Sequence, residues 1–248
     1  MKSRGKTIMQ YGCLARYFNV YSNEVDFARR NGFDFVQLWY DNKGLMLKPV
    51  AEILPEIKRA NFPAIVHAVL AVDEIVDHLP CLVGILRELG HKQIIIHPVC
   101  AKSLLVINPL EQLTDAIAVA VQTFAALDVT LFVENNSRLD PIFHDSEELE
   151  YLFAKNPAAK FLLDIAHIDD YEHLGKLVTV RKPEMLHIAD RNLANIHEHL
   201  PLGQGNIDFE RIFRTELADF DGKVVFEVIA SDEAIIAAKD YFVKLIKR

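Results

Sequence analysis

The feature that most constrains the fold of this chain is a repeated alternation of short apolar runs with longer amphipathic ones. Eight runs have the length and composition of buried strands, and segments with apolar residues at helical spacing separate them. The predicted strands span residues 8–13, 33–40, 64–69, 93–97, 129–134, 160–164, 185–189 and 223–228. Strand–helix–strand units pair their strands in parallel through right-handed crossovers. The alternation therefore predicts an α/β fold built on a parallel sheet.

Local signals mark the ends of the predicted helices, at about 23–31, 48–60, 73–89, 110–127, 146 onward, 171–177, 209–217 and 231–246. Asp73 and Ser231 are suited to N-caps, and Gly32 and Gly90 to helix ends. Pro98 is predicted to end the fourth strand.

The length of 248 residues favours a closed barrel over an open sheet. A (β/α)8 barrel typically takes about 250 residues. An open doubly wound sheet would carry a glycine-rich phosphate turn after its first strand, and the sequence Tyr11-Gly12-Cys13-Leu14 has none. We predict a single (β/α)8 TIM barrel that occupies residues 1–248 as one domain.

Composition narrows the classes of partner. The net charge of −8 disfavours a nucleic-acid partner, because an acidic surface repels the phosphate backbone. Residues 1–6 are basic, but the segment after them is too short and polar for a signal-peptide core, and no apolar run approaches a membrane span. Three scattered cysteines without a CxxC, Cys13, Cys81 and Cys100, argue against a disulfide framework. These features predict a cytoplasmic protein.

A polar residue of ligand type ends each of six consecutive predicted strands, from the third to the eighth. These residues are His67, His97, Glu134, Asp164, His187 and Glu227. In a closed parallel barrel all strand C-termini lie at one face, so the six side chains are expected to converge. His167 follows Asp164 at a short distance in sequence, and Asp190 follows His187.

Carboxylate and imidazole ligands without cysteine suit a divalent metal, and Mn²⁺, Zn²⁺, Mg²⁺ and Co²⁺ all remain open. Such a metal polarises a carbonyl or binds an alkoxide. Two carboxylates on opposite walls could move protons on either side of a carbon atom, and Glu134 and Glu227 are the natural pair. We expect one divalent metal and no organic cofactor.

Several motifs resemble the xylose-isomerase-like TIM-barrel superfamily, which includes sugar isomerases and epimerases, inosose dehydratases and endonuclease IV. The resemblance covers nearly the whole chain. Its carriers are Val-Glu-Asn (133–135), Leu-Asp-Ile-Ala-His (163–167), Leu-His-Ile-Ala-Asp (186–190), Phe-Glu-Val (226–228) and, most specifically, the segment 199–209 with Gly-Gln-Gly-Asn-Ile-Asp-Phe.

The resemblance implies a metal-dependent isomerase or epimerase of a sugar, sugar phosphate or small hydroxy-keto compound. It implies that the metal ligands are Glu134, Asp164, His187 and Glu227, and that the two glutamates form and quench a cis-enediolate. The expected substrate-binding residues are His67, His97, His167, Trp39, Arg191 and His199. The expected partner is a sugar-like small molecule, and a homo-oligomer is possible.

Two features depart from the family pattern. Members often carry a glutamate near the end of the second strand, where this chain has Gln37. No clear phosphate-binding cluster can be placed; Arg16, Arg138 and Arg191 are the candidates.

The alternative function is that of a metal phosphodiesterase similar to endonuclease IV, which holds extra metals. His67, His97 and His167 stand at positions that match its ligands, and His197-Glu198-His199 stands where that enzyme has Asp-x-His. The acidic chain, its modest length and the Ala-Val-Leu that follows His67 weigh against this alternative. An enediolate-type dehydratase is a further alternative.

Overall fold

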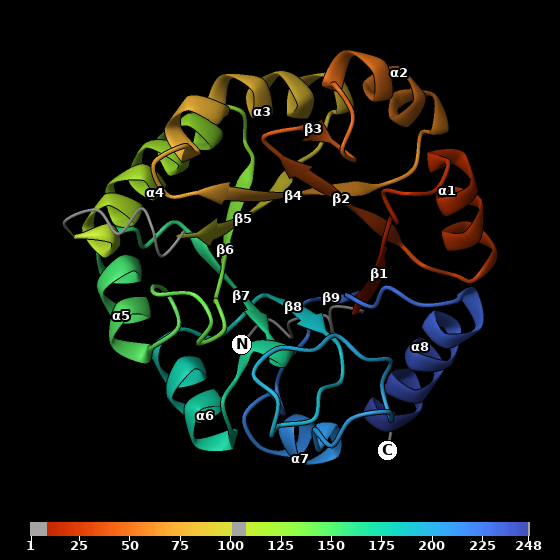
Figure 1. Cartoon of the computed structure of the whole chain (residues 1–248), viewed down its shortest axis with the longest axis vertical. Helices are drawn as coiled ribbons and strands as arrows, with labels where there is room; N and C mark the ends of the chain where they lie inside the picture. Colours follow the sequence, from red (N-terminus) through yellow and green to blue (C-terminus); the bar gives the residue numbers. More distant parts are fainter. Residues whose placement is uncertain (1–8, 101–107, 248) are drawn as a thin grey trace, which may run out of the picture.

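A closed barrel of parallel strands forms the centre of the protein, as predicted (Figure 1). The structure is a computed structural model that describes residues 9–100 and 108–247. Within these residues eight parallel strands pair in the order β1-β9-β8-β7-β6-β5-β4-β2, and β1 pairs with β2 to close the ring. The strands are β1 (Gln10–Leu14), β2 (Phe35–Asp41), β4 (Ala64–Ala71), β5 (Gln93–Val99), β6 (Thr130–Glu134), β7 (Lys160–Asp164), β8 (Met185–Ile188) and β9 (Lys223–Phe226).

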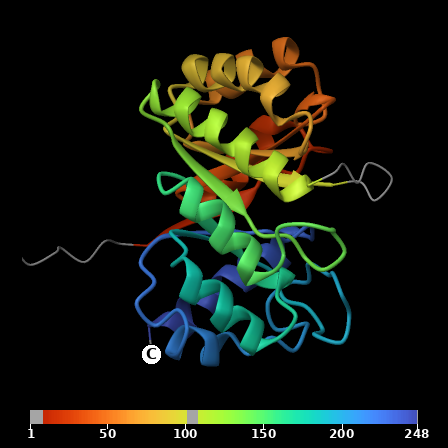
Figure 2. The ribbon, with the colours of Figure 1, turned by 90° about the vertical axis from the view of Figure 1, so that its left-hand side faces the viewer.

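Helices surround the barrel on its outer side, and the N-to-C order of strands and helices runs around the ring (Figures 1 and 2). They are α1 (Tyr21–Arg30), α2 (Val50–Ala60), α3 (Ile75–Leu89), α4 (Pro109–Ala125), α5 (Ser146–Lys155), α6 (Tyr171–Val180), α7 (Phe209–Arg214) and α8 (Asp232–Ile246), with a 3-10 turn, η2 (Ile165–His167), after β7. Their apolar faces and the outward strand residues make one large core cluster, so the helices bury the outside of the barrel.

A second, smaller cluster fills the inside of the barrel. It consists of one residue from each of seven strands: Phe35, Ile65, Ile95, Phe132, Leu162, Met185 and Val225. The remaining strand, β1, supplies Gly12, and a Cβ at that position would lie 2.3 Å from the ring of Phe35. Gly12 of β1 therefore leaves room for the Phe35 ring in the barrel interior.

Side chains two residues further along each strand point the same way, because successive residues in a strand alternate between its faces. Two residues after the interior layer stand Gln37, His67, His97, Glu134, Asp164, His187 and Glu227, with Leu14 in the eighth position. The apolar layer thus forms the floor beneath a layer that is polar on seven strands.

The structure corrects three details of the predicted elements. Pro98 does not end its strand: β5 continues to Val99, and the Pro98 carbonyl accepts a hydrogen bond from Asn136 just beyond the end of β6. The missing N–H of Pro98 breaks no hydrogen bond between β5 and β6, because the pairing of these strands ends at Ile96 and Val133. Asp73 does not cap α3, whose N-cap is Glu74. A two-residue antiparallel strand, β3 (Gly44–Leu45), was not predicted.

Other predicted features are confirmed or fall outside the described residues. Ser231 caps α8 by accepting a hydrogen bond from the Ala234 N–H. All three cysteines are free. No helix within residues 9–100 and 108–247 is long and apolar enough to cross a membrane. The basic segment 1–6 and the start of the first predicted strand lie outside the described residues.

Candidate metal and substrate site

The four predicted metal ligands meet at the C-terminal rim of the barrel. Glu134, Asp164, His187 and Glu227 each offer one ligand atom, and these atoms all lie within 4.8 Å of one another. The Nδ1 atom of His187 is 3.1 Å from Glu134 Oε1 and 3.1 Å from Glu227 Oε2. All four residues are buried. Strand ends from four consecutive strands, β6 to β9, therefore deliver three carboxylates and one imidazole to a common point.

One oxygen of Asp164, Oδ2, has no hydrogen-bond partner, although Nε2 of His167 lies 3.3 Å and Nε2 of His199 3.8 Å from it. Oδ1 accepts a hydrogen bond from the Ala166 N–H, which starts the turn η2, whereas the buried Oδ2 has none. Burial raises the pKa of Asp164 to about 7; His199 opposes this shift and the nearby Glu227 and Glu134 carboxylates add to it. A buried oxygen without a partner is costly unless a cation faces it. The donor set therefore fits a divalent metal, for which His and carboxylate ligands are suited.

Glu134 carries its charge because three histidines surround it. It accepts hydrogen bonds from His67 Nε2 at 2.7 Å and His187 Nδ1 at 3.1 Å, and His97 Nδ1 lies at 3.4 Å. Burial would raise the pKa of Glu134, but the imidazoles of His187, His97 and His67 hold it well below its usual range. Burial would lower the pKa of His97, yet the Glu134 carboxylate raises it to about 9.

Gln37 lies between two histidines and a carboxylate of this layer. Its Nε2 atom is 3.1 Å from His67 Nδ1 and 3.2 Å from Glu227 Oε1, and its Oε1 atom is 2.7 Å from His187 Nε2. The side chain is 1% exposed. Gln37, which stands where family members often have a glutamate, thus lies inside the polar layer. It contacts two of the proposed ligands, Glu227 and His187.

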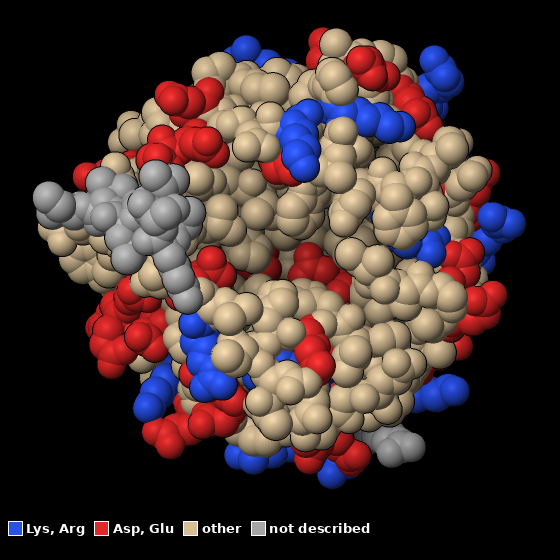
Figure 3. All heavy atoms as spheres, viewed as in Figure 1, with Lys and Arg blue, Asp and Glu red and all other residues tan. Residues whose placement is uncertain are grey.

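A cavity of about 460 Å³ opens above this layer. Figure 3 shows the same face hollowed near its centre, with acidic side chains visible in the hollow. Five of the predicted site residues line the cavity together with Glu227: Trp39, His67, His97, His167 and His199. One wall is apolar, built by Leu14, Tyr17, Phe18, Trp39 and Ile229. The cavity therefore joins a polar floor to a partly aromatic wall.

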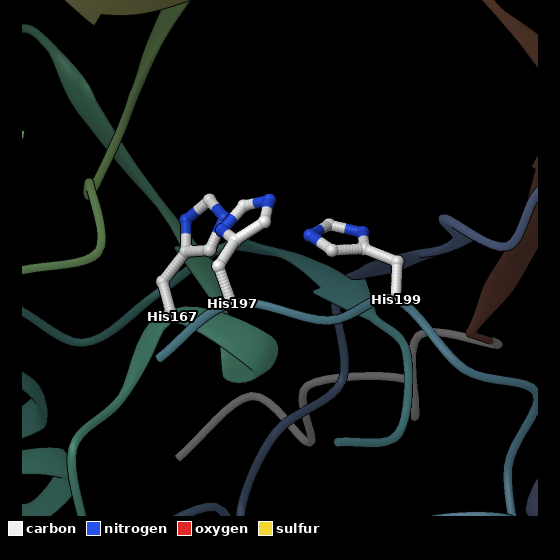
Figure 4. Close-up of side chains that lie close together, drawn as sticks. All are labelled: His167, His197 and His199. Carbon is white, nitrogen blue, oxygen red and sulfur yellow. The ribbon is translucent and has the colours of Figure 1, made fainter. Parts of the chain in front are cut away.

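Three histidines form a second group beside the carboxylates (Figure 4). The ring centroids of His167 and His197 are 5.1 Å apart, and those of His197 and His199 are 4.9 Å apart. Nε2 of His167 and Nε2 of His199 are buried without a hydrogen-bond partner. Burial lowers the pKa of His167 to about 3, so its imidazole is neutral. Burial would also lower the pKa of His199, but the Asp164 and Glu227 carboxylates instead raise it. Nitrogens without a hydrogen-bond partner make this group a candidate for a further metal or for a ligand's hydroxyl groups.

The rim loop between β8 and α7 holds two of these histidines in place. Asp190 accepts hydrogen bonds from the backbone N–H groups of Arg191, Gly203 and Ile207. Asp190 also forms an antiparallel bridge with Leu200. One carboxylate thus ties the loop that carries His197 and His199 to the end of β8.

The guanidinium groups of Arg191, Arg16 and Arg138, the three candidate arginines, contact other groups of the protein. Arg191 is 1% exposed, does not line the cavity, and donates to the backbone carbonyls of Ile196 and Ile168. Arg16 lines the cavity, but its guanidinium donates to Glu24, Asp232 and the Ala230 carbonyl. Arg138 lies 3.6 Å from Asp169 and does not line the cavity. These three candidates therefore do not assemble into a phosphate-binding cluster.

The sequence predicted the site residues that lie on strands but missed most of those that lie on loops. His197 lines the cavity although the sequence singled it out only as a departure from Asp-x-His, and Leu14, Phe18 and Ile229 were not singled out at all. Leu14 could have been found from register, because it stands two residues after Gly12. No comparable periodicity marks the residues on the loops.

The fold and the rim together define a TIM barrel whose C-terminal face gathers residues of metal-ligand type. Residues 25–245 match the family described as xylose isomerase-like TIM barrel. The chain belongs to this family.

Solved structures with the same fold include sugar epimerases. D-allulose 3-epimerase from Methylomonas sp., in complex with D-allulose, is 17% identical with a TM-score of 0.76, over 96% of this chain and 97% of that one. D-psicose 3-epimerase from Clostridium cellulolyticum H10, with D-tagatose, is 14% identical with a TM-score of 0.75, over 96% and 99%. The IolI protein with a binding zinc atom is 15% identical with a TM-score of 0.72, over 96% and 98%. No curated protein matches the sequence.

Proposed function

We propose that this protein is a divalent-metal-dependent isomerase or epimerase of a sugar or small hydroxy-keto compound, acting through a cis-enediolate. The observation that carries the proposal is the meeting of Glu134 and Glu227 at Nδ1 of His187, beside the Asp164 oxygen that has no hydrogen bond. Three carboxylates and an imidazole make a metal site with two candidate acid–base groups in the same small volume. The sugar epimerases of the same fold support this choice of chemistry.

When bound, the metal would be held by Glu134, Asp164, His187 and Glu227 and would polarise a substrate carbonyl. Glu227, at the cavity wall, is placed to take a proton from the carbon next to that carbonyl. Glu134, in the polar layer, would return a proton on the other side, and the hydrogen bond that it accepts from His67 orients it. His167 and His199 offer nitrogens to substrate hydroxyl groups, and the indole of Trp39 offers an apolar face.

Solvent-hydrogen exchange tests this proposal directly. Protein reconstituted with Mn²⁺ should incorporate deuterium from D₂O into D-allulose or a related ketose, as observed by NMR. Glu134→Gln and Glu227→Gln should each lower the exchange rate by about 10²- to 10⁴-fold, the usual contribution of a general acid or base. Glu88→Gln, on the surface in a pair with Lys58, is the matched control and should leave the rate unchanged.

The result that would contradict the acid–base assignment is unchanged turnover in both glutamine variants. Circular dichroism and thermal unfolding of the variants separate a lost fold from a lost proton-transfer group. A panel of ketoses and hydroxy-keto acids that shows no exchange in the unmodified protein would contradict the reaction class itself.

A second candidate function, a phosphodiesterase with several metals, is favoured by the cluster of His167, His197 and His199 (Figure 4). Metal analysis of the purified protein separates the two candidates. The isomerase proposal expects about one divalent metal per chain, whereas the phosphodiesterase expects two or three. Three metals together with cleavage of abasic DNA would replace the first proposal with the second.

A further inference from the structure

Gln37 is the one amide of the polar layer that faces both His67 and His187, and its orientation is determined by a neighbouring carboxylate. Glu227 Oε1, 3.2 Å away, can only accept hydrogen bonds when ionised. The end of the amide that faces Glu227 must therefore be the NH₂ group, because a carbonyl oxygen there would be repelled. The same NH₂ group lies 3.1 Å from His67 Nδ1.

The orientation of the amide dictates the tautomer of His67. Since Nδ1 of His67 accepts from Gln37, the ring proton stands on Nε2, which donates to Glu134 Oε2 at 2.7 Å. A nitrogen that carries a proton has no lone pair for a metal. His67 is therefore held as a hydrogen-bond donor to Glu134, although its position with Glu134 and His187 would otherwise suit a metal.

The other end of the amide has the opposite effect on His187. The Gln37 Oε1 atom accepts from His187 Nε2 at 2.7 Å and keeps the proton there. Nδ1, which donates to Glu134 in the metal-free protein, is therefore the nitrogen that can give up its proton to a metal. That atom faces Glu134 and Glu227 at 3.1 Å each. A hydrogen bond to the outer nitrogen of a ligating histidine is a common way to fix its tautomer and ring orientation.

We propose that Gln37 is a positioning residue that restricts the Glu134 side of the site to a single metal ion, by turning Nδ1 of His187 toward the ligands and withholding His67 from them. The proposal rests on the proposed function in one respect, that this site takes a divalent metal. It implies that His67, within β4, does not serve as a metal ligand in this chain.

The tautomers can be read in metal-free protein by NMR with ¹⁵N-labelled histidine. In the unmodified protein, His67 should show a proton on Nε2 and a hydrogen-bonded lone pair on Nδ1. Gln37→Glu keeps the shape but replaces the donor by an acceptor, so Nδ1 of His67 should gain a proton and lose its hydrogen-bonded lone pair. Gln37→Met removes both hydrogen-bonding groups, and His67 should then lose its single tautomer.

Zinc content gives a second readout that does not depend on turnover. Gln37→Glu should bind one more zinc per chain than the unmodified protein, and anomalous diffraction should locate it between His67 and Glu134. Gln112→Glu adds the same charge on the exposed face of α4 and should leave the zinc content unchanged.

Two results would overturn the proposal: His67 carrying its proton on Nδ1 in the unmodified protein, or a Gln37→Glu variant with unchanged tautomer and zinc content. If Gln37→Glu does not fold, the tautomers of the unmodified protein and of Gln37→Met still decide the question. A failure to turn over any sugar would contradict the proposed reaction and leave these two readouts unaffected.

Discussion

Arg16 shows how a single charged side chain can border the cavity without being free to bind ligand. It is 8% exposed, and its buried partner, Glu24 on α1, is 2% exposed. Nε of Arg16 lies 2.8 Å from Glu24 Oε2, and a second guanidinium nitrogen lies 2.7 Å from Asp232 Oδ1. The ion pair therefore joins the loop after β1 to both α1 and the start of α8, on either side of the closing strand.

We expect Arg16→Met to destabilise the fold by about 3–5 kcal/mol, because it leaves the buried Glu24 carboxylate without its partner. Urea unfolding followed by circular dichroism measures the loss. Lys58→Met removes one partner of an exposed pair with Glu88 and should cost at most about 1 kcal/mol. Equal losses in the two variants would show that Glu24 regains hydration when Arg16 is removed.

At the scale of the strands, the site was predictable because it follows register. Each polar rim residue from Gln37 to Glu227 stands two positions after a residue of the barrel's interior layer. An apolar run that ends in a histidine or carboxylate therefore marks both the strand and its contribution to the rim. This is why the convergence of these residues at the rim could be predicted from sequence, whereas the choice of four of them as metal ligands came from the family resemblance.

The loops follow no such rule. Arg191 follows Asp190 directly, yet its side chain donates to the backbone carbonyls of Ile196 and Ile168 and does not line the cavity. His197 reaches the cavity because the loop folds back through hydrogen bonds to Asp190, which link residues far apart in sequence. The exposed apolar residues at the mouth, Phe18 and Ile229, are equally unmarked by periodicity.

The rim loop also contains a position at which a single added methyl group should be destabilising. A Cβ on Gly205 would lie 2.4 Å from Asp190 Oδ1 and 2.5 Å from the Arg191 carbonyl oxygen. We expect Gly205→Ala to cost about 1–3 kcal/mol, as overpacking usually does, and to displace His199 from the cavity.

Thermal unfolding and the NMR signals of His199 check this expectation. Gly175→Ala is the control, since a Cβ on this glycine of α6 meets nothing within 4 Å. It should be neutral or stabilise the helix by about 0.5–1 kcal/mol. An unfolding temperature for Gly205→Ala that matches that of Gly175→Ala would show that the loop yields without strain.

For the molecule as a whole, stability should depend on pH through a group far from the rim. His91 lies between α3 and β5, at the end of the barrel opposite the site. Burial lowers its pKa to about 4, and its Nδ1 atom has no hydrogen-bond partner. The unfolded chain binds a proton there near pH 6.5, whereas the folded chain does so only near pH 4. The unfolded state thus holds more protons in this window, and stability falls as the pH falls.

We expect His91→Gln to reduce this loss between pH 6.5 and 4, because the substituted side chain does not titrate. Urea unfolding at several pH values measures the free energy of unfolding for both proteins. The difference between the two curves isolates His91 from other buried histidines such as His167. Curves that remain parallel across the window would contradict the assigned shift.

The interior layer that includes Phe35, Phe132 and Met185 has a consequence for isotope experiments on the whole protein. It fills the barrel beneath the polar layer, so within the described residues the cavity opens to solvent at the C-terminal face. Under the proposed chemistry, a hydron removed from substrate then has two fates: return to the product, or escape past Phe18 and Ile229. The fraction of hydrogen isotope retained in the product therefore measures how far the cavity opening at Phe18 and Ile229 is closed to water during turnover.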